Sequence, residues 1–139
     1  MYRVWDNIEK RWVKDGIFLS PLPNSDLYVL KKNFLGKDKL TLALDDRYVI
    51  HKFIDLYDKD SNMVYEGDII EAQISEDIVV IGIVTYAPEL SSYIIVCFDP
   101  DEFYVLGSDI CQYIKVIGNV FDTPNLIDDK RKENNVEVD

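Results

Sequence analysis

Histidine and cysteine, the side chains that most often serve as metal ligands and nucleophiles, are scarce in this sequence. His51 is the one histidine, and the cysteines are Cys97 and Cys111. One imidazole excludes a zinc site built on several histidines, and a Ser-His-acid triad would have to use His51 itself. Because His51 lies inside a strand pattern, we interpret it as a packed or half-exposed strand residue rather than a base, alone or beside a cysteine nucleophile.

Glycine is infrequent, and long apolar runs are missing. The six glycines are not clustered, which excludes a Gly-rich phosphate loop and a dinucleotide fingerprint. No stretch approaches the roughly 18 apolar residues of a membrane span, and residues 1–6 lack the apolar run of a signal peptide. We therefore expect a cytoplasmic location, no membrane partner, and thiols rather than a disulfide at the two cysteines.

Basic side chains are outnumbered, with 15 basic against 26 acidic residues and a net charge of −11. Such a charge opposes attraction to phosphate backbones, so we expect no direct binding of nucleic acid. Two readings of the charge stay open. It can serve solubility, or it can form an acidic surface that competes with nucleic acid for a basic partner protein.

The hydrophobic pattern is that of strands along most of the chain. Residues 70–75 alternate Ile, Ala and Ile with Glu, Gln and Ser, which indicates a half-buried strand. The β-branched runs 78–84 and 92–98 predict central strands buried on both faces. Gly82 and Gly118 lie inside strand patterns, where glycine indicates a bulge or a corner of a small closed sheet. The predicted fold is mainly β, with small antiparallel sheets and a barrel.

The length of 139 residues suits one domain with an appended hairpin region. We expect an N-terminal β-rich hairpin region at residues 1–57, in which residues 31–39 form either a loop or one helical turn. Residues 58–127 are expected to form a small C-terminal barrel, with one helical turn near residues 107–112. The tail at residues 128–139 is nearly all charged or amide side chains, and we predict that it is disordered.

Two acidic segments are candidates for chemistry. Residues 58–62, Asp-Lys-Asp-Ser-Asn, begin like a calcium loop, but Met63 and Ile69 stand where that loop needs glycine and a bidentate glutamate. A hairpin turn whose short polar side chains bond the backbone is the simpler interpretation. Asp99, Asp101 and Glu102 surround Pro100 and are the candidates for a carboxylate-metal hydrolase; a solvated loop tip is the alternative. We assign no catalytic, cofactor-binding or metal-binding residue.

Gly67-Asp68, in the stretch Tyr65 to Ile70, has a mechanical explanation. Glycine permits a positive φ as the chain enters a strand, and the adjacent aspartate accepts backbone N–H bonds in the turn. A catalytic Asp68 is the alternative. A related stretch, Ile117 to Asp122, closes the ordered part of the chain. The residues we single out as structural motifs are Trp5, Asp6, Tyr65, Glu66, Gly67, Asp68, Gly118 and Asn119.

Three segments, in this order, resemble the YopX-like family of small phage and prophage proteins: residues 2–6, 56–69 and 116–121. Together they span almost the whole ordered chain. The sequence departs from the family pattern at Ile54-Asp55, where a Thr-Gly pair is typical, and at residues 60–62, where the turn often holds Asn-Gly. The resemblance implies a mostly β fold whose C-terminal part is an SH3-like barrel, a phage origin, and no assigned activity or catalytic residues.

The strand pattern, the lack of a reactive constellation and the nine tyrosines favour a protein-interaction module. We expect a phage or prophage accessory protein of the host cell cytoplasm that is not an enzyme, needs no cofactor, and binds a phage or host protein through sheet edges and tyrosines. A second copy of the chain is a further candidate partner, which would give a homo-oligomer. The alternatives are an acidic, nucleic-acid-mimicking inhibitor of a host DNA-binding protein and the carboxylate-metal hydrolase.

Overall fold

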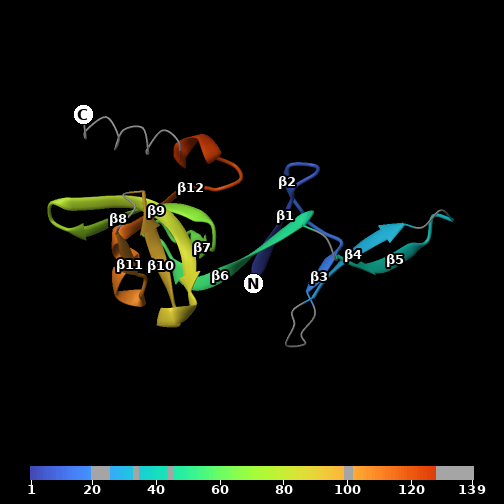
Figure 1. The fold of residues 1–139 in the computed structure, drawn as a ribbon, viewed down its shortest axis with the longest axis horizontal. Coiled ribbons are helices and arrows are strands. Elements are labelled where there is room, and N and C mark those ends of the chain that lie inside the picture. Colours follow the sequence, from blue (N-terminus) through green and yellow to red (C-terminus); the bar gives the residue numbers. More distant parts are fainter. Residues whose placement is uncertain (20–25, 33–34, 44–45, 99–101, 128–139) are drawn as a thin grey trace. The chain divides into compact units, whose positions relative to one another are not determined.

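The computed structural model confirms the predicted fold class, with a mainly β chain arranged in small antiparallel sheets (Figure 1). Contacts divide the chain into two compact units, one of residues 3–50 and the other of residues 1–2 with those from 51 onward. Residues 51–57, which the sequence analysis grouped with the N-terminal region, belong to this second unit. The residues that the structure describes are 1–19, 26–32, 35–43, 46–98 and 102–127. The predicted tail at 128–139 lies outside them.

The N-terminal unit contains most of β1, the start of β6, and four short strands between them. The bounds are β1 (Tyr2–Asp6), β2 (Arg11–Trp12), β3 (Ile17–Leu19), β4 (Leu27–Lys32), β5 (Asp38–Leu42) and β6 (Tyr48–Tyr57). The strand order is β2-β1-β6-β7 in one sheet, where β7 is Met63–Tyr65, and β3-β4-β5 in another. In the segment 31–39 a loop and a helical turn were both open, but its described ends are strand: Lys31 pairs with Lys39 and Lys32 with Asp38, at the ends of β4 and β5.

The C-terminal unit is built on a five-stranded sheet with the order β11-β10-β9-β8-β12. Its elements are β7 (Met63–Tyr65), β8 (Asp68–Ser75), β9 (Ile78–Ala87), η1 (Pro88–Leu90), β10 (Ser92–Cys97), β11 (Phe103–Val105), η2 (Ser108–Tyr113) and β12 (Ile114–Asn119). Four consecutive strands run up and down, and the 3₁₀ helix η2 then returns the chain so that β12 pairs with β8 (Figure 1). The sheet curls into a half-barrel with the strand order of an SH3-like barrel, and η2 confirms the helical turn predicted near residues 107–112.

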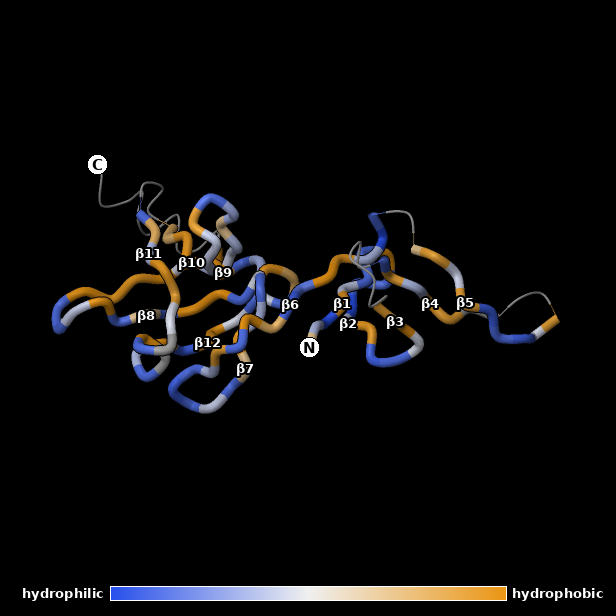
Figure 2. Tube along the Cα trace, turned by 90° about the horizontal axis from the view of Figure 1, so that it is seen from below, coloured by the Kyte–Doolittle hydropathy of each residue, from blue (hydrophilic) through white to orange (hydrophobic). Residues whose placement is uncertain are grey.

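The core of this unit lies inside the curled sheet, and hydrophobic stretches follow its strands while the turns are hydrophilic (Figure 2). Its buried members are Ile54, Val64, Ile70, Ala72, Val84, Ile95, Leu106 and Ile114. Burying one such isoleucine side chain contributes about 1.5 to 3 kcal/mol. This core therefore fixes the sheet on which the surface features of the unit are built.

One prediction about β9 is wrong. Residues 78–84 were expected to be buried on both faces, but the side chains of Ile78 and Val79 are 49% and 56% exposed. The cause is the register: β9 pairs with β8 from Ile78 onward, whereas β10 reaches β9 only as far as Gly82. The first part of β9 therefore has a neighbouring strand on one side only.

Both glycines predicted at irregular strand positions have a steric explanation. The register of β12 against β8 shifts between Val116 and Gly118, which confirms a bulge at Gly118. At Gly82 the adjacent strand passes so close that a Cβ would overlap the Val96 carbonyl. Gly82 is thus a point of close strand approach rather than a bulge, because its pairing with Cys97 and Ile70 continues in register.

Candidate functional site

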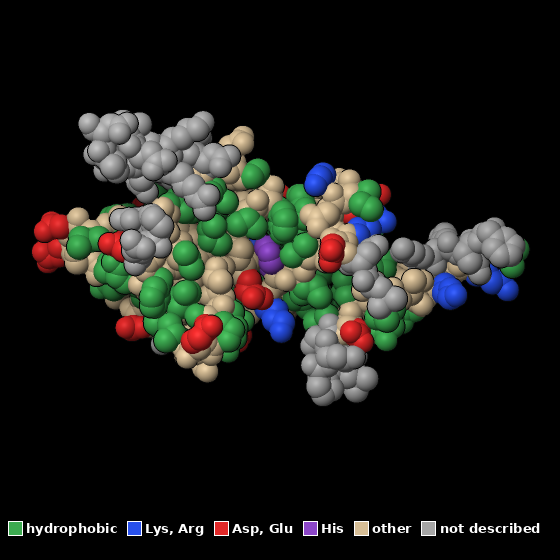
Figure 3. Space-filling model, in the orientation of Figure 1, with side chains coloured by type: hydrophobic (Ala, Val, Ile, Leu, Met, Phe, Trp, Pro, Cys, Tyr) green, Lys and Arg blue, Asp and Glu red, His purple; other side chains and the backbone are tan. Residues whose placement is uncertain are grey.

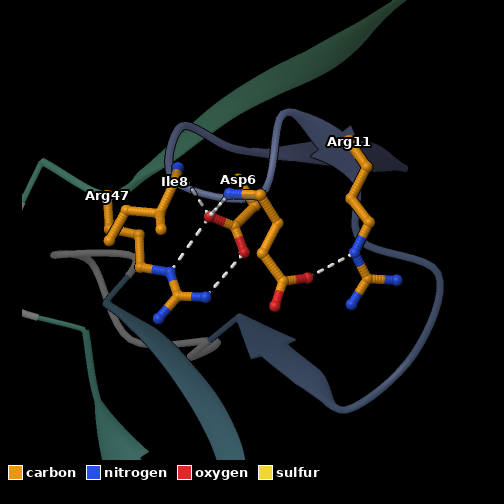
Figure 4. Close-up of polar contacts among 5 residues, drawn as sticks. Asp6, Ile8, Arg11 and Arg47 are labelled. Carbon is orange, nitrogen blue, oxygen red and sulfur yellow. Dashed lines mark hydrogen bonds and ion pairs between the residues drawn. The ribbon is translucent and has the colours of Figure 1, made fainter.

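Asp6, at the end of β1, is held on all sides by donors (Figure 4). Its side chain is almost fully buried. Arg47 donates from Nε to Oδ1 at 3.0 Å and from Nη2 to Oδ2 at 2.8 Å, and the backbone N–H groups of Ile8 and Glu9 donate to Oδ1 at 2.9 and 3.2 Å. The hydrogen bonds from Arg47 and, to a smaller extent, from the two N–H groups hold the pKa of Asp6 well below its usual range, although burial opposes ionisation. Asp6 is therefore a fixed structural anion.

Trp5 belongs to the same structural element. It lies opposite Trp12 in the β1–β2 pair, and the two rings meet edge to face at 5.1 Å between centroids. The guanidinium carbon of Arg3 lies 4.4 Å from the centroid of the Trp12 ring. Aromatic pairs of this geometry and a cation over a tryptophan both stabilise a small sheet. Trp5 and Asp6 thus hold the N-terminal unit together.

The Tyr65 to Asp68 motif forms a tight junction between β7 and β8. Gly67 has a φ of +79°, and a Cβ there would overlap the imidazole ring of His51. Asp68 Oδ2 accepts the N–H of Tyr65 at 2.8 Å. Glu66 Oε1 accepts the N–H of Lys52 at 2.8 Å, which ties the motif to β6.

His51 is buried in β6 and lies against two other motif segments. Its ring stacks on Phe121 with 5.3 Å between centroids and an interplanar angle of 21°. The Gly67 carbonyl, on the other side of the junction, accepts the N–H of Val120 at 3.0 Å. His51 therefore joins the Gly67 turn to the end of β12, a packing role that matches its interpretation as a packed strand residue.

Asn119 organises the turn that follows β12. Its Oδ1 accepts the N–H groups of Phe121 and Asp122 at 3.0 and 2.8 Å, and its Nδ2 donates to Asp122 Oδ2 at 2.9 Å. Thr123 Oγ1 accepts the N–H of Asn119 at 3.0 Å, and a Cβ at Gly118 would overlap this hydroxyl. The motif residues of β12 thus shape a turn, as those near Gly67 do.

Asp58 is a second buried anion, and the sequence analysis did not include it among the motif residues. Oδ1 accepts the N–H groups of Asp60 and Asn62 at 3.0 and 2.8 Å, and Oδ2 accepts the N–H of Val116 at 3.0 Å. Burial alone would raise its pKa, but these hydrogen bonds outweigh it and hold the pKa below its ordinary value. Both oxygens are occupied, so the segment resembling a calcium loop is a turn fastened to β12. The run of short polar residues at 58–62 was the signal for it.

The described part of the chain gathers no metal-binding cluster among the remaining reactive candidates. Within the described chain, no group of three or more His, Cys, Asp or Glu side chains could hold a metal ion. Asp99 and Asp101 lie outside the described residues, Glu102 is exposed, and Cys97 is present as a buried thiol. The carboxylate-metal hydrolase stays a prediction, tested by thermal melting with and without magnesium, manganese or zinc.

An open groove of about 460 Å³ lies between the β8–β9 hairpin, β11 and η2. Its lining is apolar, aromatic and acidic: Gln73, Ile74, Ser75, Glu76, Tyr104, Val105, Asp109, Ile110 and Tyr113. None of these nine residues is Lys or Arg. Burial, together with the negative charge of Glu102, raises the pKa of the Tyr104 hydroxyl above its ordinary value. Sequence reasoning missed this groove because its residues come from three separate segments.

The β3-β4-β5 sheet carries an apolar face that is exposed. Phe18 pairs with Tyr28 and Tyr28 with Leu42, while Leu30 pairs with Leu40 two residues further along. Directly paired residues and those two positions apart share one face of a sheet. On this face Phe18, Leu30 and Leu40 are 51%, 41% and 50% exposed, whereas Leu27 and Val29 on the opposite face are buried. We call the five residues Phe18, Tyr28, Leu30, Leu40 and Leu42 the apolar face.

Fold and motifs together define a mainly β protein with an SH3-like C-terminal half-barrel, whose motif residues hold turns. A family described as YopX protein matches residues 1–128. The chain belongs to this family, which confirms the resemblance seen in its three sequence motifs. A comparison of the sequence with curated proteins gave no match. Within the described residues, no helix combines the length and apolar character needed to cross a bilayer.

Two solved structures share the fold. The crystal structure of protein YopX from Bacillus subtilis matches with a TM-score of 0.60 at 15% identity, covering 90% of this chain and 95% of that one. Protein EF1440 from Enterococcus faecalis matches with a TM-score of 0.51 at 19% identity, covering 91% of this chain and 96% of that one. At these identities the likeness extends to the fold alone.

Proposed function

We propose that this chain is a phage or prophage accessory protein that acts by binding protein rather than by catalysis, and that a second copy of the chain is its partner. The observation that carries the proposal is the apolar face of the β3-β4-β5 sheet. Exposed apolar residues that occur singly are ordinary, but three that adjoin the half-buried Tyr28 and Leu42 on one face are typical of a contact surface. Covering them with a partner removes apolar area from water.

The distribution of charge supports a second copy as the occupant. Residues 27–43, which carry β4 and β5, hold four lysines and one aspartate, a net charge of +3. Residues 51–127 hold fourteen acidic and three basic residues, a net charge of −11. Figure 3 shows acidic side chains gathered at the end of the C-terminal unit formed by the β8–β9 hairpin. A lysine-bearing apolar sheet in one copy and an acidic unit in the next are complementary, and such a heterologous contact builds oligomers.

The molecular mass in solution, measured by light scattering at about 100 μM, tests this proposal. The wild-type chain should have a mass of two or more times 16.2 kDa. Replacing two exposed members of the face, as Phe18→Ser with Leu40→Ser, should give the monomer with an unchanged circular dichroism spectrum. The matched control is Ile8→Ser, an exposed apolar residue of the same unit outside the apolar face, which should leave the mass unchanged. A monomeric wild-type chain would exclude self-association.

A second candidate, the acidic mimic of nucleic acid that inhibits a host DNA-binding protein, is favoured by the same concentration of charge. The −11 of residues 51–127 lies in one unit rather than being spread evenly along the chain. Such a unit attracts basic DNA-binding surfaces. Gel-shift competition against purified host DNA-binding proteins tests this candidate. Release of DNA at stoichiometric protein would support it, and unchanged DNA binding across the panel would exclude it.

A further inference from the structure

We propose that the groove between the β8–β9 hairpin, β11 and η2 is a binding site for an extended peptide in which lysine or arginine stands beside apolar residues. This site lies in the C-terminal unit and shares no residue with the apolar face. The inference therefore does not depend on the apolar face. It stands on the shape of the groove, the chemistry of its lining and the sheet edge beside it.

The apolar part of the groove is rigid. Ile74 and Ile110 line it and also pack against the buried core of the unit. Val105 completes the apolar lining and is 53% exposed. Because the isoleucines are fixed by the core, the groove is formed before a ligand arrives, which reduces the ordering cost of binding. An apolar side chain of a ligand can pack against Ile74, Ile110 and Val105 without rearranging them.

Two tyrosines give the groove aromatic surfaces. Tyr104 comes from β11 and Tyr113 from the end of η2, and the Tyr113 side chain is 48% exposed. The face of an aromatic ring attracts lysine and arginine cations, and it also packs on proline and aliphatic side chains. These surfaces favour a cation or an apolar group over an anion.

Charge decides between cationic and anionic ligands. Glu76 from the hairpin and Asp109 from η2 line the groove together with the tyrosines, and no basic residue does. The surrounding residues 51–127 add to this negative field with their net charge of −11. A carboxylate or phosphate ligand would be repelled, while a lysine or arginine would be attracted on approach and on docking.

The sheet edge indicates a peptide rather than a small cation. β11 is the terminal strand of the five-stranded sheet, and it supplies both Tyr104 and Val105 to the groove. An extended segment that adds to such an edge forms main-chain hydrogen bonds, and its alternate side chains point to one face. On β11 that arrangement would place every second side chain of the peptide toward the tyrosines and carboxylates.

Fluorescence polarisation with a labelled ten-residue peptide that repeats Arg-Arg-Leu-Leu, so that each face of the extended peptide carries both Arg and Leu, tests the proposal beside a peptide with Glu in place of Arg. We expect the basic peptide to bind and the acidic peptide to bind at least about tenfold more weakly. Amide chemical-shift changes should centre on residues 73–76, 104–105 and 109–113. Shifts centred elsewhere, or equal affinity for both peptides, would overturn the proposal.

A charge-matched pair of variants separates the groove from the bulk charge. E76Q with D109N removes two charges in the groove, and E71Q with E89Q removes two exposed charges of the same unit outside it. The groove variant should weaken binding of the basic peptide about fivefold or more, while the control should change it less than twofold. Tyr113→Ala, at a half-exposed position, should weaken binding with an unchanged amide spectrum elsewhere. Equal weakening by both charge pairs would show bulk attraction and refute the site.

Discussion

The imidazole ring of His51 lies in the space that a side chain at Gly67 would occupy. The ring position of His51 therefore requires glycine at position 67. Gly67 also has a φ of +79°, which disfavours any other residue there. Gly67→Ala should therefore lower the free energy of unfolding by about 2 to 4 kcal/mol, through backbone strain and overlap together. Urea unfolding followed by circular dichroism measures the change.

Gly36→Ala is the matched control. Gly36 has nearly the same backbone angle, a φ of +78°, but no atom lies within 4 Å of the position of its Cβ. Its substitution should cost only about 1 kcal/mol of strain. In the Gly67→Ala background, His51→Ala should recover part of the loss, whereas additive effects would show that the two residues are not coupled.

Asp58→Ala removes the acceptor of three backbone N–H groups. The N–H of Val116, in β12, then loses its hydrogen bond inside the folded unit. We expect the substitution to lower the free energy of unfolding by about 2 to 4 kcal/mol, because hydrogen bonds to a buried charged group are strong. Asp60→Ala, two residues away and exposed, should change it by less than about 0.5 kcal/mol. Equal effects of the two substitutions, measured by urea unfolding, would contradict the structural role of Asp58.

Asn119→Ala should loosen the turn after β12. It leaves the N–H groups of Phe121 and Asp122 without their acceptor, at a cost of about 1 to 2 kcal/mol. Asn125→Ala, at an exposed position of the same segment, serves as the control. Hydrogen exchange should become faster at residues 119–123 in the first variant and stay unchanged in the second.

Stability should fall in acid because Asp6 and Asp58 have a lower pKa in the folded chain than in the unfolded chain. The bond from Arg47 lowers the pKa of Asp6, and the N–H bonds to Asp58 outweigh its burial. As the pH drops below about 5, the unfolded chain takes up protons first, so the stabilisation present at neutral pH is progressively lost. Asp6→Asn should start from a lower stability at pH 7 and show a shallower decline between pH 5 and pH 3. A decline as steep as that of the wild-type chain would contradict this assignment.

Local patterns in the sequence predicted the strands, and they also pointed to the turn chemistry. Alternation at residues 70–75 marks β8 because strand side chains have a period of two, and the glycine of Gly67-Asp68 anticipated the positive φ. Both features depend on neighbours in the sequence. Local chemistry was therefore enough to recognise them.

What sequence reasoning missed depends on contacts between distant residues. Asp6 and Arg47 are 41 positions apart, and no local pattern pairs them. The groove joins three segments that meet only when η2 returns the chain to β8. Ile78 is exposed because β10 ends before it can pair with this part of β9. The apolar face results from the register of three strands. Composition reveals neither the pairing length nor the register.

Hydrogen exchange at low and high protein concentration tests the central claim, association through the apolar face, most directly. Amides of β4 and β5 should exchange more slowly at about 200 μM than at about 1 μM in the wild-type chain. In the Phe18→Ser with Leu40→Ser variant the two concentrations should give the same rates. Identical exchange of β4 and β5 in the wild-type chain at both concentrations would contradict the account.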